Sequence, residues 1–311
     1  MRGRALSPLP DGPLPLVLAF LAPAGFVLSW LPHSWKLWLG RQLGNLAYGV
    51  LPGRRRLARQ NLAAAFGEER SPEEVTHLCR ESFRHQGMTL MEVCTLLFRP
   101  PAALLSRVEV EGVSHLQAAA ARGRGVLLLG AHLGNWELLT VAHTLTGYPL
   151  SVIVRPMDSP VLNRIVTRIR KRSGVEVINK RQALPAMLEA LRRQRMVGIL
   201  LDQNTTRREG VFVPFFGRPA STSKSLALLT LRSGAPVVPV FIHREPDGAH
   251  RVIIEPEVRL SPTGDREKDI VAYTEGFSHI VEGAISRWPA QWLWMHGRWR
   301  TRPPLSRSEG G

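Results

Sequence analysis

The chain has 311 residues, of which 44% are hydrophobic, 7% aromatic and 21% charged. This composition is typical of a globular protein and excludes a disordered, collagen-like or disulfide-framework chain. The 41 Lys and Arg against 25 Asp and Glu give a formal charge of +16. Such an excess favours an acidic or phosphorylated partner, a nucleic acid or an anionic membrane.

A nearly unbroken apolar run over residues 14–31 follows a basic N-terminus. The run contains two prolines and is short for a bilayer about 30 Å thick. The residue types that settle at the depth of lipid headgroups gather at its end, namely Trp30, Trp35, Lys36, Trp38 and Arg41. We therefore predict that residues 1–50 are an uncleaved segment lying in the membrane surface. A cleaved signal peptide, a transmembrane helix and a helix of the domain core are the alternatives.

Residues 51–100 are predicted to be helical. Apolar residues recur at helical spacing between Arg54 and Phe66. The arginines of this stretch are suited to lipid phosphates, at about 1 kcal/mol each near an anionic surface, or form an ordinary solvated face. Ser71-Pro72-Glu73-Glu74 is typical of a helix start, and the helix that follows is predicted to end near Phe98.

From about residue 108 to 300, short β-branched runs alternate with stretches of helical period. Strands are predicted at 126–129, 150–154, 175–178, 197–201, 236–242 and 251–254, and helices at 136–145, 160–172, 181–194 and 222–232. Apolar strands separated by helices predict an α/β fold with a mostly parallel sheet flanked by helices. Ligands of such sheets bind beyond the carboxyl ends of the strands, so polar residues that follow strands are candidates for the site.

The first candidate follows the strand at 126–129, where a glycine-flanked His132 precedes a predicted helix. His132 and Glu137 can meet if the histidine lies on the loop and the glutamate in the first helical turn. A carboxylate that orients an imidazole favours a general base, able to deprotonate a hydroxyl that attacks an acyl group. The alternative is a structural histidine followed by a favourable first-turn acid.

Three further candidates lie at later strand ends. Arg155 is suited to a phosphate or a developing oxyanion, or is a plain surface arginine. Asp202-Gln203-Asn204 either binds substrate or forms a turn. The predicted loop at 211–222 holds three phenylalanines for an acyl-chain groove or for the core, and Ser221 or Thr222 is predicted to cap the next helix. The sequence has no zinc-ligand spacing, Walker A loop or dinucleotide fingerprint, so no metal site is expected.

Taken in order, these motifs resemble the bacterial lipid A biosynthesis acyltransferases of the late lauroyl and myristoyl type, within the lysophospholipid acyltransferase superfamily. The resemblance covers nearly the whole chain. It rests on the apolar N-terminal segment, the stretch from Arg54 to Phe66, and these further blocks: His132-Leu133-Gly134-Asn135-Trp136-Glu137, Val154-Arg155-Pro156, Asp202-Gln203-Asn204, Val213-Pro214-Phe215-Phe216-Gly217, Pro236-Val237-Val238-Pro239-Val240, Trp294-Met295-His296 and Arg300-Thr301-Arg302-Pro303. Glu137 stands where many members of the superfamily have aspartate. The F-P-E-G block of glycerolipid acyltransferases is absent, which favours the lipid A branch or related glycolipid acyltransferases.

The resemblance implies an O-acyltransferase that moves a fatty acyl chain from acyl carrier protein to a hydroxyl of a lipid A precursor. It places the enzyme at the cytoplasmic face of the inner membrane and implies three partners, which are the carrier protein, a phosphorylated glycolipid and the anionic membrane. His132 is then the general base, Glu137 the acid that orients it, and Arg155 the residue that stabilises charge on substrate or intermediate. The remaining substrate-binding candidates are Asn135, Asp202, Gln203 and Asn204. No cofactor is expected beyond the acyl donor, because direct attack by a hydroxyl needs only a base and an oxyanion stabiliser.

Two other functions stay open. The first is the same chemistry on another bacterial glycolipid, such as a mannosylated phosphoinositide or an ornithine-type lipid. A non-catalytic nucleic-acid-binding protein is favoured by the charge and by the alternating aromatics and arginines of residues 291–303. No nucleic acid is expected as a partner, since the chain lacks a recognisable binding motif and has an apolar N-terminal run.

Overall fold

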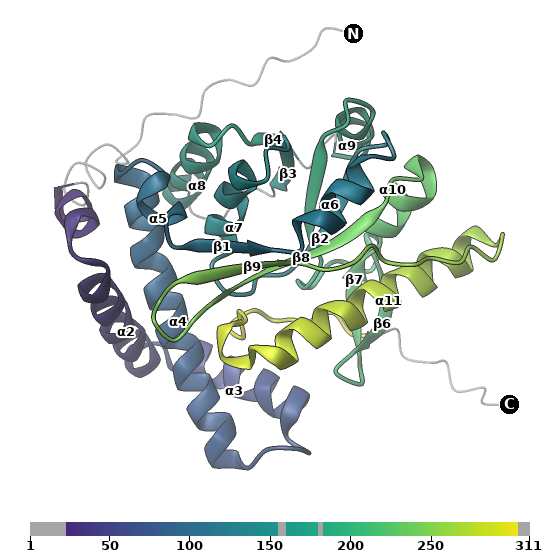
Figure 1. Ribbon diagram of the computed structural model, residues 1–311. Coiled ribbons are helices and arrows are strands. Elements are labelled where there is room, and N and C mark those ends of the chain that lie inside the picture. Colours follow the sequence, from purple (N-terminus) through teal and green to yellow (C-terminus); the bar gives the residue numbers. More distant parts are fainter. Residues whose placement is uncertain (1–22, 155–159, 180–182, 304–311) are drawn as a thin grey trace, which may run out of the picture.

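A computed structural model of the protein describes residues 23–154, 160–179 and 183–303. Its central sheet has the strand order β1-β9-β8-β2-β5-β3-β4 (Figure 1). The strands are β1 (Val108–Glu111), β2 (Val126–Gly130), β3 (Leu150–Val154), β4 (Glu176–Asn179), β5 (Met196–Leu200), β8 (Val237–Arg244) and β9 (His250–Ile254). Neighbouring strands are parallel except β8 and β9, which are antiparallel. The predicted α/β fold with a mostly parallel sheet is therefore confirmed.

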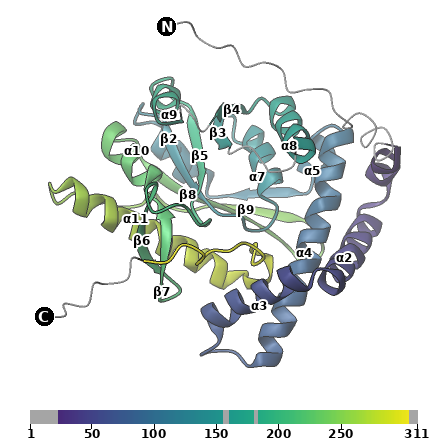
Figure 2. The same ribbon diagram turned by 180° about the vertical axis from the view of Figure 1, so that it is seen from behind.

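Helices cover both faces of the sheet (Figures 1 and 2). Side chains of α3 (Pro52–Phe66), α9 (Ala183–Arg192), α10 (Ser225–Ser233) and α11 (Arg266–Arg287) pack in the core on one face. The other face is covered by the end of α4 (Pro72–Phe98) and by α5 (Ala102–Leu105), α6 (Val113–Ala120), α7 (Trp136–Ala142) and α8 (Pro160–Arg172).

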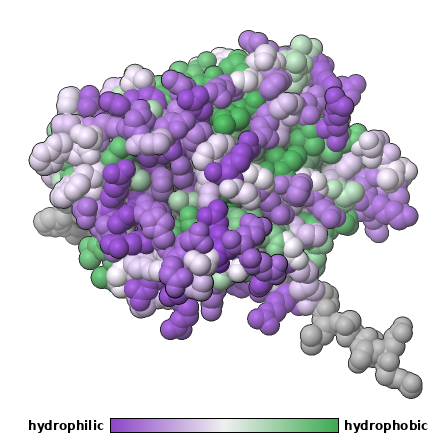
Figure 3. All heavy atoms as spheres, turned by 60° about the horizontal axis from the view of Figure 1, so that its bottom comes forward, coloured by the Kyte–Doolittle hydropathy of each residue, from purple (hydrophilic) through white to green (hydrophobic). Residues whose placement is uncertain are grey.

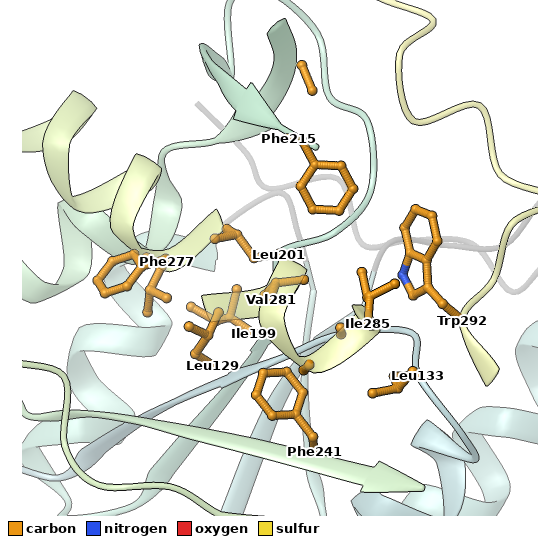
Figure 4. Packing of buried hydrophobic residues seen from close by; sticks show 14 of the residues in the cluster. Leu129, Leu133, Ile199, Leu201, Phe215, Phe241, Phe277, Val281, Ile285 and Trp292 are labelled. Carbon is orange, nitrogen blue, oxygen red and sulfur yellow. The ribbon is translucent and has the colours of Figure 1, made fainter. Parts of the chain in front are cut away.

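The period of two along each strand separates these two cores. In β2, Leu127 and Leu129 point into the first core, and Val126 and Leu128 point to the second. Figure 4 shows the first core, where Leu129 and Ile199 of the sheet lie with residues of α11. Burial on both faces explains why the strands read as continuous apolar runs rather than as alternating ones.

Local sequence signals account for several element boundaries. Ser71 and Glu74 form the capping box that starts α4, and this helix ends at Phe98 as predicted. The stretch at 211–222 was predicted to be a loop, but β6 (Gly210–Phe215) and β7 (Arg218–Ser223) form an antiparallel hairpin there. Ser221 and Thr222 lie on β7, so the prediction that one of them caps the next helix is wrong. That helix, α10, begins at Ser225.

Three glycines bring α2 (His33–Val50) into close contact with α4. A Cβ at Gly87 would lie 2.0 Å from the carbonyl oxygen of Gly40, and one at Gly44 would lie 2.4 Å from that of Phe83. Because α2 reaches α4 through this glycine side, its other side carries exposed apolar residues, which are Trp35, Trp38, Leu43, Leu46 and Val50. Figures 1 and 2 both show α2 at the edge of the molecule, outside α4.

The predicted membrane segment is only partly described. Residues 14–22 of the apolar run lie outside the described residues, whereas 23–30 are helical. Among the helices that the structure describes, none is long and apolar enough to cross a bilayer. Hydrophilic residues dominate the face seen in Figure 3, with hydrophobic ones in patches between them.

Candidate active site

His132 and Asp202 meet because their strands are neighbours. β2 and β5 are parallel, with Gly130 paired to Leu200, and each of the two side chains follows its strand end by two residues. Nδ1 of His132 lies 2.8 Å from Oδ1 of Asp202. The backbone N–H of His132 donates to Oδ2 of the same carboxylate at 3.0 Å, and the Trp292 indole N–H donates to it at 2.7 Å. Asp202 is thus a buried carboxylate that fixes the imidazole.

This network leaves Nε2 of His132 as the basic nitrogen. Burial raises the pKa of Asp202, but attraction to His132 and the hydrogen bonds to the carboxylate outweigh it and lower the pKa to about 2. The ionised carboxylate accepts a hydrogen bond from the Nδ1–H of His132. The lone pair of the neutral ring is therefore on Nε2. The side-chain amide of Gln203 donates to that nitrogen at 3.1 Å. A hydroxyl that replaces this amide would find a base already oriented toward it.

No hydrogen bond joins Glu137 to His132 in the structure, and the predicted role of Glu137 as the orienting acid stays a prediction. It lies in the first turn of α7 and faces α8, where Arg170 donates to both of its carboxylate oxygens at 3.0 and 2.8 Å. Both side chains are nearly buried. The loop before α7 turns His132 toward the end of β5 instead, so the orienting carboxylate comes from Asp202.

The other predicted residues have separate places. Asn135 is fully buried, where it caps α7 through the N–H of Leu138 and donates to Glu92 at 2.7 Å. Its role as a substrate-binding residue stays a prediction. Asp202 is 2% exposed, and its predicted contact with substrate likewise stays a prediction. Arg155 lies outside the described residues.

The two residues that follow Asp202 differ from it in their surroundings. Gln203 and Asn204 both line the cavity described below, and their roles as substrate-binding residues stay predictions. The side chain of Asn204 is held on both sides by Thr301, through hydrogen bonds of 3.0 and 3.1 Å. This pair ties the C-terminal segment to the exit of β5.

A buried ionic cluster braces the elements behind the loop. Glu92 of α4 accepts hydrogen bonds from Arg244 of β8 at 2.6 Å and pairs with His250 of β9 at 2.9 Å. Burial opposes the ionisation of Glu92, but Arg244 and His250 overcome it and hold its pKa well below the usual range. Because Asn135 donates to the same carboxylate, the start of α7 is fixed to α4 and to the sheet.

The sequence reasoning missed the C-terminal contribution to the site. Trp292 holds Asp202, and His296 accepts a hydrogen bond at Nε2 from the backbone N–H of Asn204 at 3.0 Å. Neither residue follows a strand, so the search of strand ends could not select them. The Trp294-Met295-His296 block pointed to this segment through the family resemblance, but it did not predict which residues these side chains contact.

A cavity of about 1390 Å³ opens beside His132. Polar residues contribute to its lining, among them His132, Gln203, Glu137, Arg170 and His296. Apolar residues of the sheet contribute as well, among them Leu128, Val152, Leu200, Val240, Val252 and Ile254. Leu128 and Leu200 belong to central strands yet are only partly buried, since the cavity lies over that face of the sheet. The volume exceeds the ~300–1,000 Å³ of common small-molecule sites and suits a long apolar group.

The comparison with known proteins decides the family. The family described as bacterial lipid A biosynthesis acyltransferase matches residues 16–301. The chain belongs to this family. It is 32% identical over 275 residues to the lipid A biosynthesis palmitoleoyltransferase of Escherichia coli K12, an overlap that covers 88% of this chain and 87% of that protein. It is 31% identical over 274 residues to the lipid A biosynthesis lauroyltransferase of the same organism, an overlap that covers 88% of each chain.

A relative with a different acceptor is also similar. The phosphatidylinositol mannoside acyltransferase of Mycolicibacterium smegmatis is 26% identical over 246 residues, covering 78% of each chain. The protein is therefore an acyl-transferring enzyme of the lipid A and glycolipid acyltransferase family.

Proposed function

We propose that this enzyme transfers a fatty acyl chain from acyl carrier protein to a hydroxyl of a phosphorylated lipid A precursor, with His132 as the general base. The observation that carries the proposal is the His132–Asp202 pair, whose histidine lines a cavity that is also lined by many apolar residues. The base can reach a hydroxyl in this cavity while an acyl chain contacts the apolar residues. Asp202 takes the orienting role, and Glu137 with Arg170 forms a second, separate ion pair in the cavity wall.

The reaction follows from this arrangement. The acceptor oxygen attacks the thioester carbonyl carbon as Nε2 of His132 takes the hydroxyl proton, and the carbonyl oxygen becomes an oxyanion. Asp202 stabilises the imidazolium without accepting its proton, because its pKa is lowered to about 2. When the tetrahedral intermediate collapses, the carbon–sulfur bond breaks and the carrier thiolate takes the proton from His132. The products are an ester and a free carrier thiol.

Charge supports the acidic donor and the phosphorylated acceptor. The chain carries a formal charge of +16, and five Lys or Arg side chains line the cavity. Arg170 is paired with Glu137, and the other four are Arg54, Arg208, Lys224 and Arg300. Guanidinium groups hold phosphate oxygens in a planar, two-bond geometry, so these residues are suited to a phosphorylated sugar at the cavity entrance.

We further place the enzyme at the cytoplasmic face of the inner membrane. Trp35 and Trp38 of α2 are 60% and 55% exposed, on a surface that also carries other large apolar residues. Exposed arginines of α3, the next helix along the chain, include Arg54, which also lines the cavity. A surface of this kind supports docking on an anionic bilayer, with the cavity near the lipid headgroups.

The deciding experiment is mass spectrometry of lipid A from the source organism with and without the gene. Loss of one secondary acyl chain, restored by the wild-type enzyme and not by His132→Ala, is the expected result. In the purified enzyme this variant should lose about 10²–10⁴-fold in turnover, the usual contribution of a general base. His77→Ala, which removes an exposed histidine of α4, is the matched control and should restore the chain.

Two outcomes would change the conclusion. Full activity of His132→Ala would refute the mechanism. An unchanged lipid A profile would move the acceptor to another membrane glycolipid, for which the similarity to a phosphatidylinositol mannoside acyltransferase gives the first candidate.

A further inference from the structure

His296 is fixed as a neutral imidazole with its proton on Nδ1. The backbone N–H of Asn204 donates to Nε2 at 3.0 Å, and an N–H can donate only to the nitrogen that carries the lone pair. The backbone is held as well, since the Asn61 amide donates to the carbonyl oxygens of Trp294 and His296 at 2.8 and 2.7 Å. The ring is thus held at its distal nitrogen and through its own backbone.

The Nδ1–H of His296 is an uncommitted donor in the cavity. Among the residues that the structure describes, no hydrogen-bond partner is found for Nδ1, and this atom is not one of those enclosed by protein without a partner. The side chain lines the same cavity as His132 and Gln203. Burial, reinforced by His132 and nearby arginines against the opposing effect of Asp202, lowers the pKa of His296 to about 4. The ring therefore stays neutral and keeps its donor at physiological pH.

Three consecutive residues place His296 next to the base. Asp202 holds Nδ1 of His132, Gln203 contacts Nε2 of His132, and the N–H of Asn204 holds His296. Two residues of extended chain span at most about 7 Å. Both rings line the same cavity, and His132 is close enough to affect the pKa of His296. Consider an acceptor hydroxyl that is hydrogen-bonded to His132, with the carbonyl carbon of the acyl donor about 3 Å away. The oxygen of that carbonyl can then point to the ring of His296.

We propose that His296 is a catalytic residue whose Nδ1–H donates a hydrogen bond to the oxyanion of the tetrahedral intermediate. The inference rests on the proposed acyl transfer. As the bond between acceptor oxygen and carbonyl carbon forms, the carbonyl π electrons move to its oxygen, which accepts this hydrogen bond. His296 transfers no proton, and on collapse the C=O bond re-forms as the thiolate leaves. A neutral imidazole suits this role because it polarises the carbonyl without competing with His132 for the acceptor proton.

Two substitutions separate this role from a structural one. His296→Gln places an amide oxygen where Nε2 was, so the bond from Asn204 is kept and the donor at the δ position is lost. His296→Asn does the reverse, because its amide nitrogen takes the place of Nδ1 and nothing accepts from Asn204. Both are measured in the purified full-length enzyme with an acyl carrier protein thioester and a lipid A precursor, alongside thermal unfolding.

The expected result is that His296→Gln lowers kcat about 10²–10³-fold, with KM for both substrates and the unfolding temperature little changed. His296→Asn is expected to keep more of the kcat than His296→Gln although it unfolds at lower temperature. A His296→Gln enzyme with wild-type kcat overturns the proposal, even if His296→Asn does not fold. A rise in the KM for the lipid A precursor with unchanged kcat also overturns the proposal. It would mean that the Nδ1–H of His296 binds a phosphate of that substrate. Full activity of His132→Ala in the same assay would refute the proposed function itself, whatever the His296 variants do.

Discussion

At the scale of single residues, the site depends on which carboxylate holds His132. Position alone identified the histidine, because it follows a predicted strand between two glycines. The choice of Glu137 came from closeness in sequence and from family resemblance, whereas Asp202 is 70 residues away and reaches His132 only through the pairing of β2 with β5. Strand order is a tertiary property, so one sequence could predict that both loops lie at the same edge of the sheet but not that they touch.

Asp202→Asn tests this assignment. An amide in place of the carboxylate can donate to Nδ1 and so stabilise the tautomer with its proton on Nε2, which removes the base. We expect kcat to fall by about 10²–10⁴-fold, while hydrogen bonds from Trp292 and from the His132 backbone still hold the side chain. Steady-state kinetics with a thermal melt decide the matter, and Asp247→Asn, at an exposed turn, is the control. An Asp202→Asn enzyme with undiminished kcat would return the orienting role to another residue.

At the scale of elements, the sequence predicted most of the sheet and its helices, because buried strands and amphipathic helices have distinct periods. The hairpin of β6 and β7 was missed since Val213, Phe215 and the residues around them gave no clear alternation. The cavity could not be predicted either, because side chains from strands far apart in sequence form it. Its floor includes Gly198 in the middle of β5, a residue that the strand pattern treated as one more apolar position.

Gly198 gives a prediction about the length of the acyl chain, which rests on the proposed function. A Cβ there would lie 3.4 Å from Cγ1 of Val152 and 3.6 Å from Cδ1 of Leu150, both ordinary contacts, so the fold should accept a side chain. In Gly198→Met the added atoms fill part of the cavity, and the preferred chain should shorten by about three or four carbons. Competition between acyl donors of graded length measures this, with Gly198→Ala as the intermediate case. An unchanged preference in a folded Gly198→Met enzyme would place the chain elsewhere.

At the scale of the whole molecule, helix α2 exposes an apolar face to solvent. Gly40, Gly44 and Gly87 bring α2 onto α4, and the exposed tryptophans of α2 then lie on the opposite side. The sequence predicted a surface-seeking segment from the clustering of Trp with Lys and Arg. It could not show that Lys36 is buried against α4, where its ammonium donates to Thr95 at 3.3 Å.

The outward surface leads to a prediction about the proposed membrane binding. Trp35→Ser with Trp38→Ser should weaken binding to vesicles of anionic lipid by about ten- to a hundredfold, since burial of each aromatic contributes about 1.5–3 kcal/mol when complete. Neither tryptophan is part of the core, so the melting temperature and turnover of a short-chain soluble donor should change little. Val271→Ser, at an exposed apolar residue of α11, is the control in the flotation assay. Equal flotation of all three proteins would refute docking through α2.

The positions of the site residues in the sequence also determine the order in which the site is assembled during synthesis. His132 and Asp202 are translated before the indole of Trp292 and the ring of His296, and both of these later groups contact residues that follow β5. A chain cut short before Trp292 lacks the indole donor to Asp202 and the second imidazole. Under the proposed mechanism such a product is inactive, although all seven strands of the described central sheet precede the cut.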